Sequence, residues 1–313
     1  MKKKLLFVLM ALVCAFTCAF AMTGCSKGVQ YKFELSEGGE SYTFTGISYY
    51  SNGSSEKIEI EIPAEYKGKP VTKIKEGACD GLHIRKVTIP NTVTFIDKEA
   101  FRSSEIETVV FGDYSQAELA THDDTLQPYS LYIGERAFAG NEIKNVTIPE
   151  NAHLGARAFQ SSEVESVTFK GGVSVKKDGS TNFDAFSSCK LKSIDLPDND
   201  AGYSIALSYF IETQPRIDHI KDYVMTLEYV VVPKHVKVSE QYWANKQIAN
   251  EDIYPPIIYF KGDILEFKGP SGTLKCKEYN KSEKTFSQFV FYYSEDSKSG
   301  NYWHYLNDKP TKW

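Results

Sequence analysis

The residue types that most often carry out catalysis are present but scattered along the chain. The six histidines stand singly, at positions 83, 122, 153, 219, 235 and 304. Only His122 has neighbours of metal-ligand type, Asp123 and Asp124, and we favour a solvated acidic loop there. The sequence contains no nucleophile elbow, zinc-protease motif, phosphate loop or Cys-x-x-Cys pair. We therefore expect a protein that is not an enzyme and that holds no cofactor or metal.

One cysteine has a chemically specific context. Lys2-Lys3-Lys4 precedes an almost wholly apolar run over residues 5–22, and Met22-Thr23-Gly24 then leads to Cys25. This arrangement resembles a bacterial lipobox, and the resemblance implies cleavage before Cys25 and acylation of its thiol. A plain signal peptide and an uncleaved membrane anchor are the alternatives. Acyl chains contribute about 0.8 kcal/mol per buried CH₂, so two or three chains would anchor the protein firmly.

A lipidated Cys25 would fix the location of the protein. Residues 1–24 are then a lipoprotein signal peptide, and residues 25–30 are the acylated cysteine with a short tether. The folded part is expected at the extracytoplasmic face of the cell membrane, on the cell surface. Membrane contact is expected through the lipid anchor only.

Charge and cysteine count exclude further classes. The chain carries 36 Lys and Arg against 41 Asp and Glu, a formal net charge of −5 at pH 7. These charges are spread out, without the basic patch typical of nucleic-acid binding. Cys79 and Cys189 are expected to be core thiols, because about four strand spacings, roughly 19 Å, would separate them. The state of Cys276 stays open.

The rest of the chain is organised by an internal repeat. Small-aromatic pairs recur, and nine residues after each Ala stands a β-branched residue, which we call position 0. Apolar residues also occupy positions −3 and +2 around it. The pairs begin at Ala100, Ala137, Ala158 and Ala185, with Ala78-Cys79 as a degenerate copy, and position 0 is held by Val87, Val109, Val146, Val167 and Ile194.

This pattern predicts a β-rich repeat solenoid with a parallel strand face. One short strand per unit cannot bury its apolar side alone, but stacked units can, at roughly 4.8 Å per strand. Positions 0 and +2 point inward. The Ala-Phe pairs are expected on the far wall, where Ala permits close approach and Phe fills the space between layers. Proline after position +2, at Pro90, Pro149 and Pro197, ends strand pairing.

The units resemble the BspA-type leucine-rich repeat, whose consensus begins roughly I-P-x-x-V-x-x-I-G-x-x-A-F-x-x-C. Residues 92–97 and 131–136 fit well, with Asp97 in place of Gly. The resemblance is clear over about residues 58–197, and it implies a bacterial surface lipoprotein that adheres to host matrix proteins or other cells. Cys189 fits the Cys position, whereas Glu105, Asn141 and Glu163 lie near it and depart from it.

The flanking segments are expected to cover the two ends of the stack. Residues 31–75 read as an N-terminal cap with two antiparallel strands, residues 76–260 as the solenoid, and residues 261–313 as a β-rich C-terminal cap. A short helix is predicted over residues 204–212 and a strand over residues 286–293.

Outward-facing positions predict a solvated strand face. Position −2 alternates in charge from unit to unit, which favours cross-strand ion pairs worth roughly a few tenths of a kcal/mol each. Small hydroxyl residues flank this row, so the face should be flat and without an obvious pocket. The position −2 residues are Arg85, Glu107, Lys144, Glu165 and Lys192.

Ligand contact is expected at two places. Insertions at 112–130 and 170–181 emerge along one edge of the solenoid, and such an edge often binds ligands. The C-terminal end is rich in aromatic residues. Tolerated surface variation and packing of the cap are the structural alternatives. The candidate ligand-binding residues are Tyr114 and Tyr129 in the first insertion, and Tyr229, Tyr259 and Trp303 at the C-terminal end.

Three functions stay open on the sequence. The first is a lipid-anchored surface protein that binds a macromolecule, such as an extracellular protein, through the solenoid. The second is a carbohydrate-binding surface module that uses the aromatic C-terminal end to hold a glycan. The third is a cell-envelope scaffold with no soluble ligand.

Overall fold

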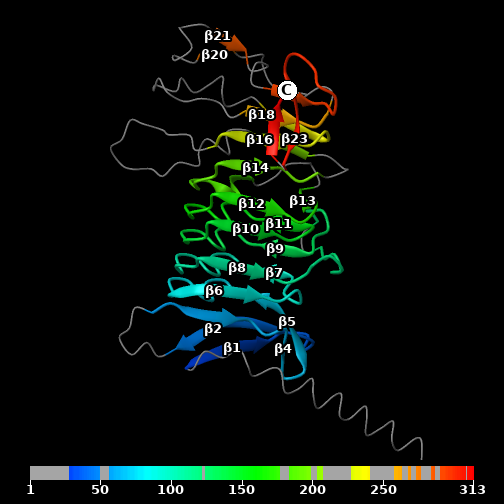
Figure 1. Ribbon diagram of the computed structural model, residues 1–313. Coiled ribbons are helices and arrows are strands. Elements are labelled where there is room, and N and C mark those ends of the chain that lie inside the picture. Colours follow the sequence, from blue (N-terminus) through cyan, green and yellow to red (C-terminus); the bar gives the residue numbers. More distant parts are fainter. Residues whose placement is uncertain are drawn as a thin grey trace, which may run out of the picture.

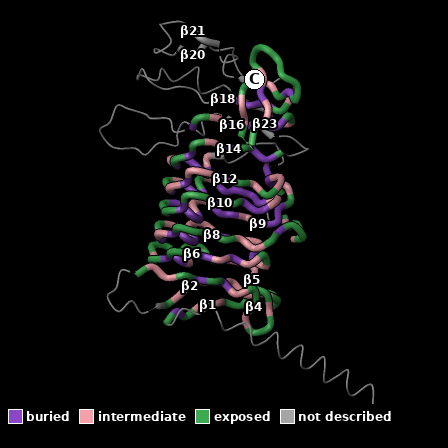
Figure 2. The backbone as a smooth tube through the Cα atoms, viewed as in Figure 1, coloured by how far each residue is buried: buried purple, intermediate pink, exposed green. Residues whose placement is uncertain are grey.

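The protein is an elongated stack of β-coils that runs from β1 at one end to the C-terminal strands at the other (Figure 1). The computed structural model describes residues 28–49, 56–121, 124–176, 183–198, 203–206, 227–239, 257–262, 267–268, 273–275, 283–285, 290–307 and 309–313. Buried residues run through the interior of the stack, and exposed and half-buried residues cover its outer walls (Figure 2).

The first wall consists of the strands that position 0 predicts. Pairing is parallel and keeps position 0 in register, with Val87 opposite Val109 and Val146 opposite Val167. These side chains are buried, so the predicted strand face is confirmed. The strands are β3 (Ile58–Glu61), β6 (Ile84–Ile89), β8 (Thr108–Phe111), β10 (Asn145–Ile148), β12 (Ser166–Phe169), β14 (Ser193–Asp195), β16 (Tyr229–Val232) and β18 (Ile257–Phe260).

A second sheet, which sequence reasoning missed, forms another wall. Its later strands are only two or three residues long, and two of them, β7 (Phe95–Ile96) and β11 (Ala152–Leu154), follow Pro90 and Pro149 by a few residues. The V and second I positions of the repeat consensus could have revealed this sheet, because the residues there, such as Val93 and Ile96, are buried. The order is β1 (Val29–Leu35), β2 (Tyr42–Tyr49), β5 (Lys69–Ile74), β7 (Phe95–Ile96), β9 (Leu131–Ile133), β11 (Ala152–Leu154) and β13 (Val173–Ser174), with β4 (Glu65–Tyr66) paired to β5.

The third side of each coil is the corner that carries the Ala-Phe pair. Phe101, Phe138, Phe159 and Phe186 stack in one column, with successive ring centroids 5.2, 5.3 and 5.3 Å apart. Both members of each pair are buried. The column fills the space between layers, as the repeat predicts, and the last ring lies in the 3₁₀ turn η2 (Phe183–Phe186).

A buried polar column stands beside the phenylalanines, and it corrects the alignment of the Cys position. That position lies four residues after each Ala and is filled by Ser104, Asn141, Ser162 and Cys189, so Asn141 occupies it, and Glu105 and Glu163 are one residue beyond. Each side chain donates to a carbonyl of the preceding coil. The acceptors are the carbonyls of Cys79, Phe101, Phe138 and Phe159, in that order.

The N-terminal end matches the expected cap in part. β1 and β2 are antiparallel, as predicted. However, β3 already pairs in parallel with β6, and β5 with β7, so the first coil of the solenoid lies inside the segment 31–75.

The C-terminal end is built from additional strands of the same sheet. β22 (Val290–Tyr293), β23 (Tyr302–Leu306) and β24 (Lys309–Lys312) extend the sheet of β14, β16 and β18. The predicted helix at residue 204 is wrong over its described part, because β15 (Tyr203–Ala206) pairs in parallel with β17 (Val236–Ser239). The remaining short strands are β19 (Phe267–Lys268), β20 (Thr273–Lys275) and β21 (Glu283–Thr285).

Both cysteines in the described coils are buried free thiols, as predicted. Burial raises the pKa of the Cys79 and Cys189 thiols to about 12. Cys25 and Cys276 lie outside the described residues. Within the described ranges, no helix combines the length and the apolar character needed to span a membrane.

Candidate binding face

The outer face of β6 to β14, which we call the polar face, is lined by small side chains. Thr108, Val110, Asn145, Thr147 and Thr168 are all exposed on it. Neighbouring strands are linked there by side chains as well, because the Ser166 hydroxyl donates to Asn145 Oδ1 at 2.6 Å. The face therefore offers hydroxyl and amide groups on a rigid backbone.

The charged residues at position −2 form ion pairs, but only some of these pairs join position −2 residues of successive units, as the alternation of charge predicts. Lys192 lies 2.5 Å from Glu165, and its hydrogen bond and charge hold the pKa of Glu165 below the ordinary value. Arg85 instead pairs with Glu59 at 2.6 Å, and Glu107 pairs with Lys57 at 3.0 Å. These exposed pairs contribute little to stability.

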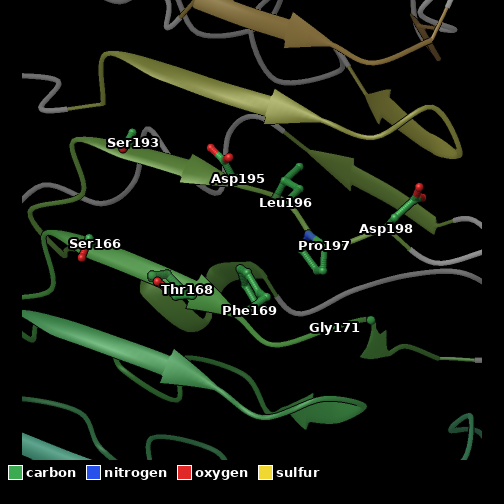
Figure 3. Close-up of a pocket in the computed structure, with 11 residues that line it drawn as sticks. Ser166, Thr168, Phe169, Gly171, Ser193, Asp195, Leu196, Pro197 and Asp198 are labelled. Carbon is green, nitrogen blue, oxygen red and sulfur yellow. The ribbon is translucent and has the colours of Figure 1, made fainter. Parts of the chain in front are cut away.

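The polar face is interrupted between β8 and β10 and again between β12 and β14, and a cleft of about 500 Å³ lies at the second interruption. β12 and β14 belong to different sheets. They stay together at one end, where Lys192 N donates to Glu165 O at 3.2 Å. Beyond this point Thr168 and Phe169 lie on one side of the cleft, and Asp195 and Leu196 lie on the other (Figure 3). The expectation of a face without a pocket is therefore wrong at this position.

The cleft combines an apolar floor with a polar rim. Val167 and Leu196 are buried at its base, and the hydroxyls of Ser166, Thr168 and Ser193 lie around it. Among the described residues that line it, none is Lys, Arg or His. The volume of the cleft falls within the range of small-ligand sites, roughly 300–1,000 Å³.

Two carboxylates at the rim already have partners. Burial raises the pKa of Asp195, while the nearby charge of Lys261 and a hydrogen bond from Tyr305 oppose that rise. Asp198 Oδ1 lies 3.1 Å from Nδ1 of His235. Both carboxylates keep further oxygen lone pairs that can accept hydrogen bonds from a ligand.

The two candidate tyrosines of the first insertion are packing residues. Tyr114 is 4% exposed, and its hydroxyl donates to Val93 O at 2.7 Å. Tyr129 is 0% exposed and packs against Tyr132 and His153 of the second sheet. A side chain without exposed surface offers a ligand nothing to contact, so we do not keep either residue as a ligand contact.

This first insertion lies across the outer side of the second sheet. Gln127 N donates to Val175 O at 2.9 Å, Ser174 Oγ donates to Gln127 O at 2.8 Å, and buried Leu126 pairs with Lys176. The insertion therefore covers β11 and β13, which is a structural role that its sequence did not reveal.

The aromatic candidates of the C-terminal end mostly cover one another. Trp303 is 0% exposed, and its indole N–H donates to Phe260 O at 3.0 Å. It packs on Tyr259 and Val231, so the hairpin of β23 and β24 covers the outer side of β16 and β18. Tyr229 is half-buried against Tyr259. The structure supports cap packing for Trp303 and Tyr259, which we no longer treat as ligand contacts.

A row of stacked rings on the second sheet was also missed. Phe95 stacks on Tyr132 at 4.7 Å and Tyr132 on His153 at 5.4 Å, while Lys73 Nζ lies 4.7 Å from the centre of the Phe95 ring. Because these ring faces contact one another, they are not available to a sugar ring. The row therefore stabilises the sheet rather than forming a platform.

Metal binding finds no support in the described ranges, where no three His, Cys, Asp or Glu side chains cluster as metal ligands. His122 and Asp123 lie outside those ranges, so the acidic loop stays a prediction.

The chain belongs to the BspA type leucine rich repeat region family. The family model matches six copies, over residues 43–178, 108–214, 131–248 and 155–298. These matches extend the family beyond the residues that resemble it most clearly, into the C-terminal part. Among curated proteins, none matches the chain.

Three solved structures are similar to the chain. A leucine-rich repeat protein from Bacteroides capillosus is 27% identical, with 48% of this chain and 99% of that chain covered and a TM-score of 0.35. The leucine-rich repeat protein of T. pallidum is 16% identical, with 67% and 83% covered and a TM-score of 0.43. One from Bacteroides ovatus is 20% identical, with 78% and 67% covered and a TM-score of 0.36.

Proposed function

We propose that the protein is a lipid-anchored bacterial surface protein that binds an extracellular macromolecule through the polar face of its solenoid. Membership of the BspA-type family supports a surface-associated interaction. The sequence around Cys25 supports the lipid anchor. The family is typically non-catalytic, and the proposed role is binding without catalysis.

The observation that carries the proposal is the openness of the polar face. The insertion covers the second sheet at β11 and β13, the hairpin of β23 and β24 covers β16 and β18, and the phenylalanine column fills the corner. Between these covered regions, the outer side chains of β8, β10 and β12 are exposed. A rigid sheet face holds its groups in place, so little ordering entropy opposes binding.

Two matched substitutions test which surface binds. Val110 is 38% exposed on the polar face, and Leu119 is 51% exposed on the first insertion. Val110→Arg places a long charged side chain in the middle of the face, whereas Leu119→Arg makes the same kind of change at the insertion edge. The full acylated chain, held in lipid nanodiscs, is assayed against extracellular-matrix proteins and a glycan array.

We expect Val110→Arg to weaken binding at least about tenfold and Leu119→Arg to leave it unchanged, since a buried clash typically costs 1–3 kcal/mol. The reverse result would move the site to the insertion edge. Absence of saturable binding to either set of ligands would refute the proposal and favour a scaffold. Loss of acylation in Cys25→Ser, read by mass spectrometry, tests the anchor separately.

A further inference from the structure

We infer that the cleft between β12 and β14 binds a neutral saccharide unit of the ligand. This inference rests on the proposed function, because it assigns a chemical class to what the polar face holds. It places the glycan site in the middle of the solenoid, away from the aromatic C-terminal end.

The cleft is a fixed part of the fold, because the coils separate only on their strand sides. β12 and β14 belong to different sheets, and so do β13 and β15. Strand pairing on the two walls therefore stops at the same coil. The corner nevertheless stays closed there. Phe159 N donates to Ala185 O at 2.7 Å, the rings of Phe159 and Phe186 stack, and Cys189 Sγ donates to Phe159 O at 3.1 Å. The corner thus joins the two coils beside the opening.

The lining disfavours charged ligands of either sign. A phosphate, uronic acid or sialic acid would meet Asp195 and Asp198, and the described lining residues include no basic side chain to balance its charge. A cationic ligand would compete with groups that are already present, because Lys261 lies near Asp195 and His235 contacts Asp198. A neutral ligand with many hydroxyls avoids both costs.

The arrangement of polar and apolar groups fits a sugar ring. The hydroxyls of Thr168 and Ser193 and the carboxylate of Asp195 can exchange hydrogen bonds with ring hydroxyls. Half-buried Phe169 supplies apolar surface for the C–H face of the ring (Figure 3). The opening onto the polar face leaves room for a saccharide that continues as a chain.

The cap approaches the rim of the cleft. Tyr305 of β23 is near enough to Asp195 to oppose the rise in the pKa of that carboxyl.

Isosteric substitutions inside the cleft and away from the polar face give the test. Thr168→Val removes a hydroxyl inside the cleft and keeps the shape of the side chain. Thr45→Val makes the same change on β2, outside both the cleft and the polar face, and is the matched control. Asp195→Asn keeps an acceptor and removes the charge. Binding of the full chain in nanodiscs is measured on a glycan array and then by calorimetry with the best neutral oligosaccharide.

We expect saturable binding of neutral glycans, weakened about tenfold by Asp195→Asn, about threefold by Thr168→Val and unchanged by Thr45→Val, since a hydrogen bond to a charged acceptor is stronger than one between neutral groups. Equal affinities of all four chains, or selective binding of acidic glycans, would overturn the inference. Binding of a protein that Val110→Arg abolishes, without any glycan binding, would overturn the inference and leave the proposed function standing.

Discussion

Asn141 links two coils of the solenoid, and its replacement by alanine should be among the most damaging single changes in the core. The side chain is 1% exposed. Its Oδ1 accepts hydrogen bonds from Ser104 N at 3.1 Å and Ile106 N at 3.0 Å, and its Nδ2 donates to Phe101 O at 2.8 Å. Asn141→Ala removes all three partners at once.

The magnitude follows from the number of buried groups. Each unsatisfied buried donor or acceptor costs about 1–3 kcal/mol, and water that enters the space would recover part of this. Three such groups give a loss of about 4 kcal/mol, a large fraction of the 5–15 kcal/mol typical of a folded domain. The melting temperature should fall by about 10 °C. A second Nδ2 contact, to Phe138 O at 2.8 Å, matters less because Ser162 also donates to that carbonyl.

Equilibrium urea unfolding, followed by circular dichroism, measures this loss. The matched control is Asn145→Ala, which removes an exposed asparagine four residues later and should change the unfolding free energy by less than about 0.5 kcal/mol. Hydrogen exchange of the Ser104 and Ile106 amides gives a local readout, and both should exchange faster in Asn141→Ala. A loss below about 1 kcal/mol with unchanged exchange would refute the reasoning.

Three further predictions concern backbone strain, thiol reactivity and pH. Ser161 adopts φ 56°, which costs an L-residue about 1–2 kcal/mol. Ser161→Gly should therefore raise the free energy of unfolding by about 0.5–1 kcal/mol in urea denaturation. Gly140 adopts φ 70° in the equivalent turn, so Gly140→Ala should lower the free energy of unfolding in the same assay. Cys79 and Cys189, with thiol pKa values raised to about 12, should resist alkylation in the native protein at pH 8 and react on unfolding, as read by mass spectrometry. Burial raises the pKa of Asp195 above its ordinary value of 3.8, so the folded state prefers the protonated carboxyl. The free energy of unfolding of the wild type, relative to that of Asp195→Asn, should therefore fall as the pH rises above 3.8. If urea unfolding gives the same difference between the two proteins at every pH, the prediction is wrong.

Most of the fold was predictable because the repeat is defined by residue types at fixed, short separations along the chain. Position 0 marks a buried strand in every described coil, and the Ala-Phe pairs form the corner column. The error in the Cys position was one of alignment by a single residue, which counting four from each Ala would have avoided. The second sheet was missed because strands such as Phe95–Ile96 are too short to show alternation.

The candidate site was predicted poorly, because exposure of an aromatic residue depends on what packs over it. The sequence around Tyr129 and Trp303 does not distinguish these buried side chains from exposed tyrosines and tryptophans. Tyr129 is buried by a sheet that forms from residues on both sides of its insertion, and Trp303 is buried on strands more than forty residues earlier. The cleft forms at the coil where strand pairing stops on both walls, between β12 and β14 and between β13 and β15.

The sequence by itself determined the period of the coil, the inward and outward sides of each strand and the identity of the core, since these depend on residue type at fixed spacing. Only the tertiary structure decided which outer surfaces are left open. That depends on how segments far apart along the chain pack on one another, as the hairpin of β23 and β24 does on β16 and β18. Local spacing carries no information about such contacts, and for this reason the polar face and its cleft became visible only in the folded protein.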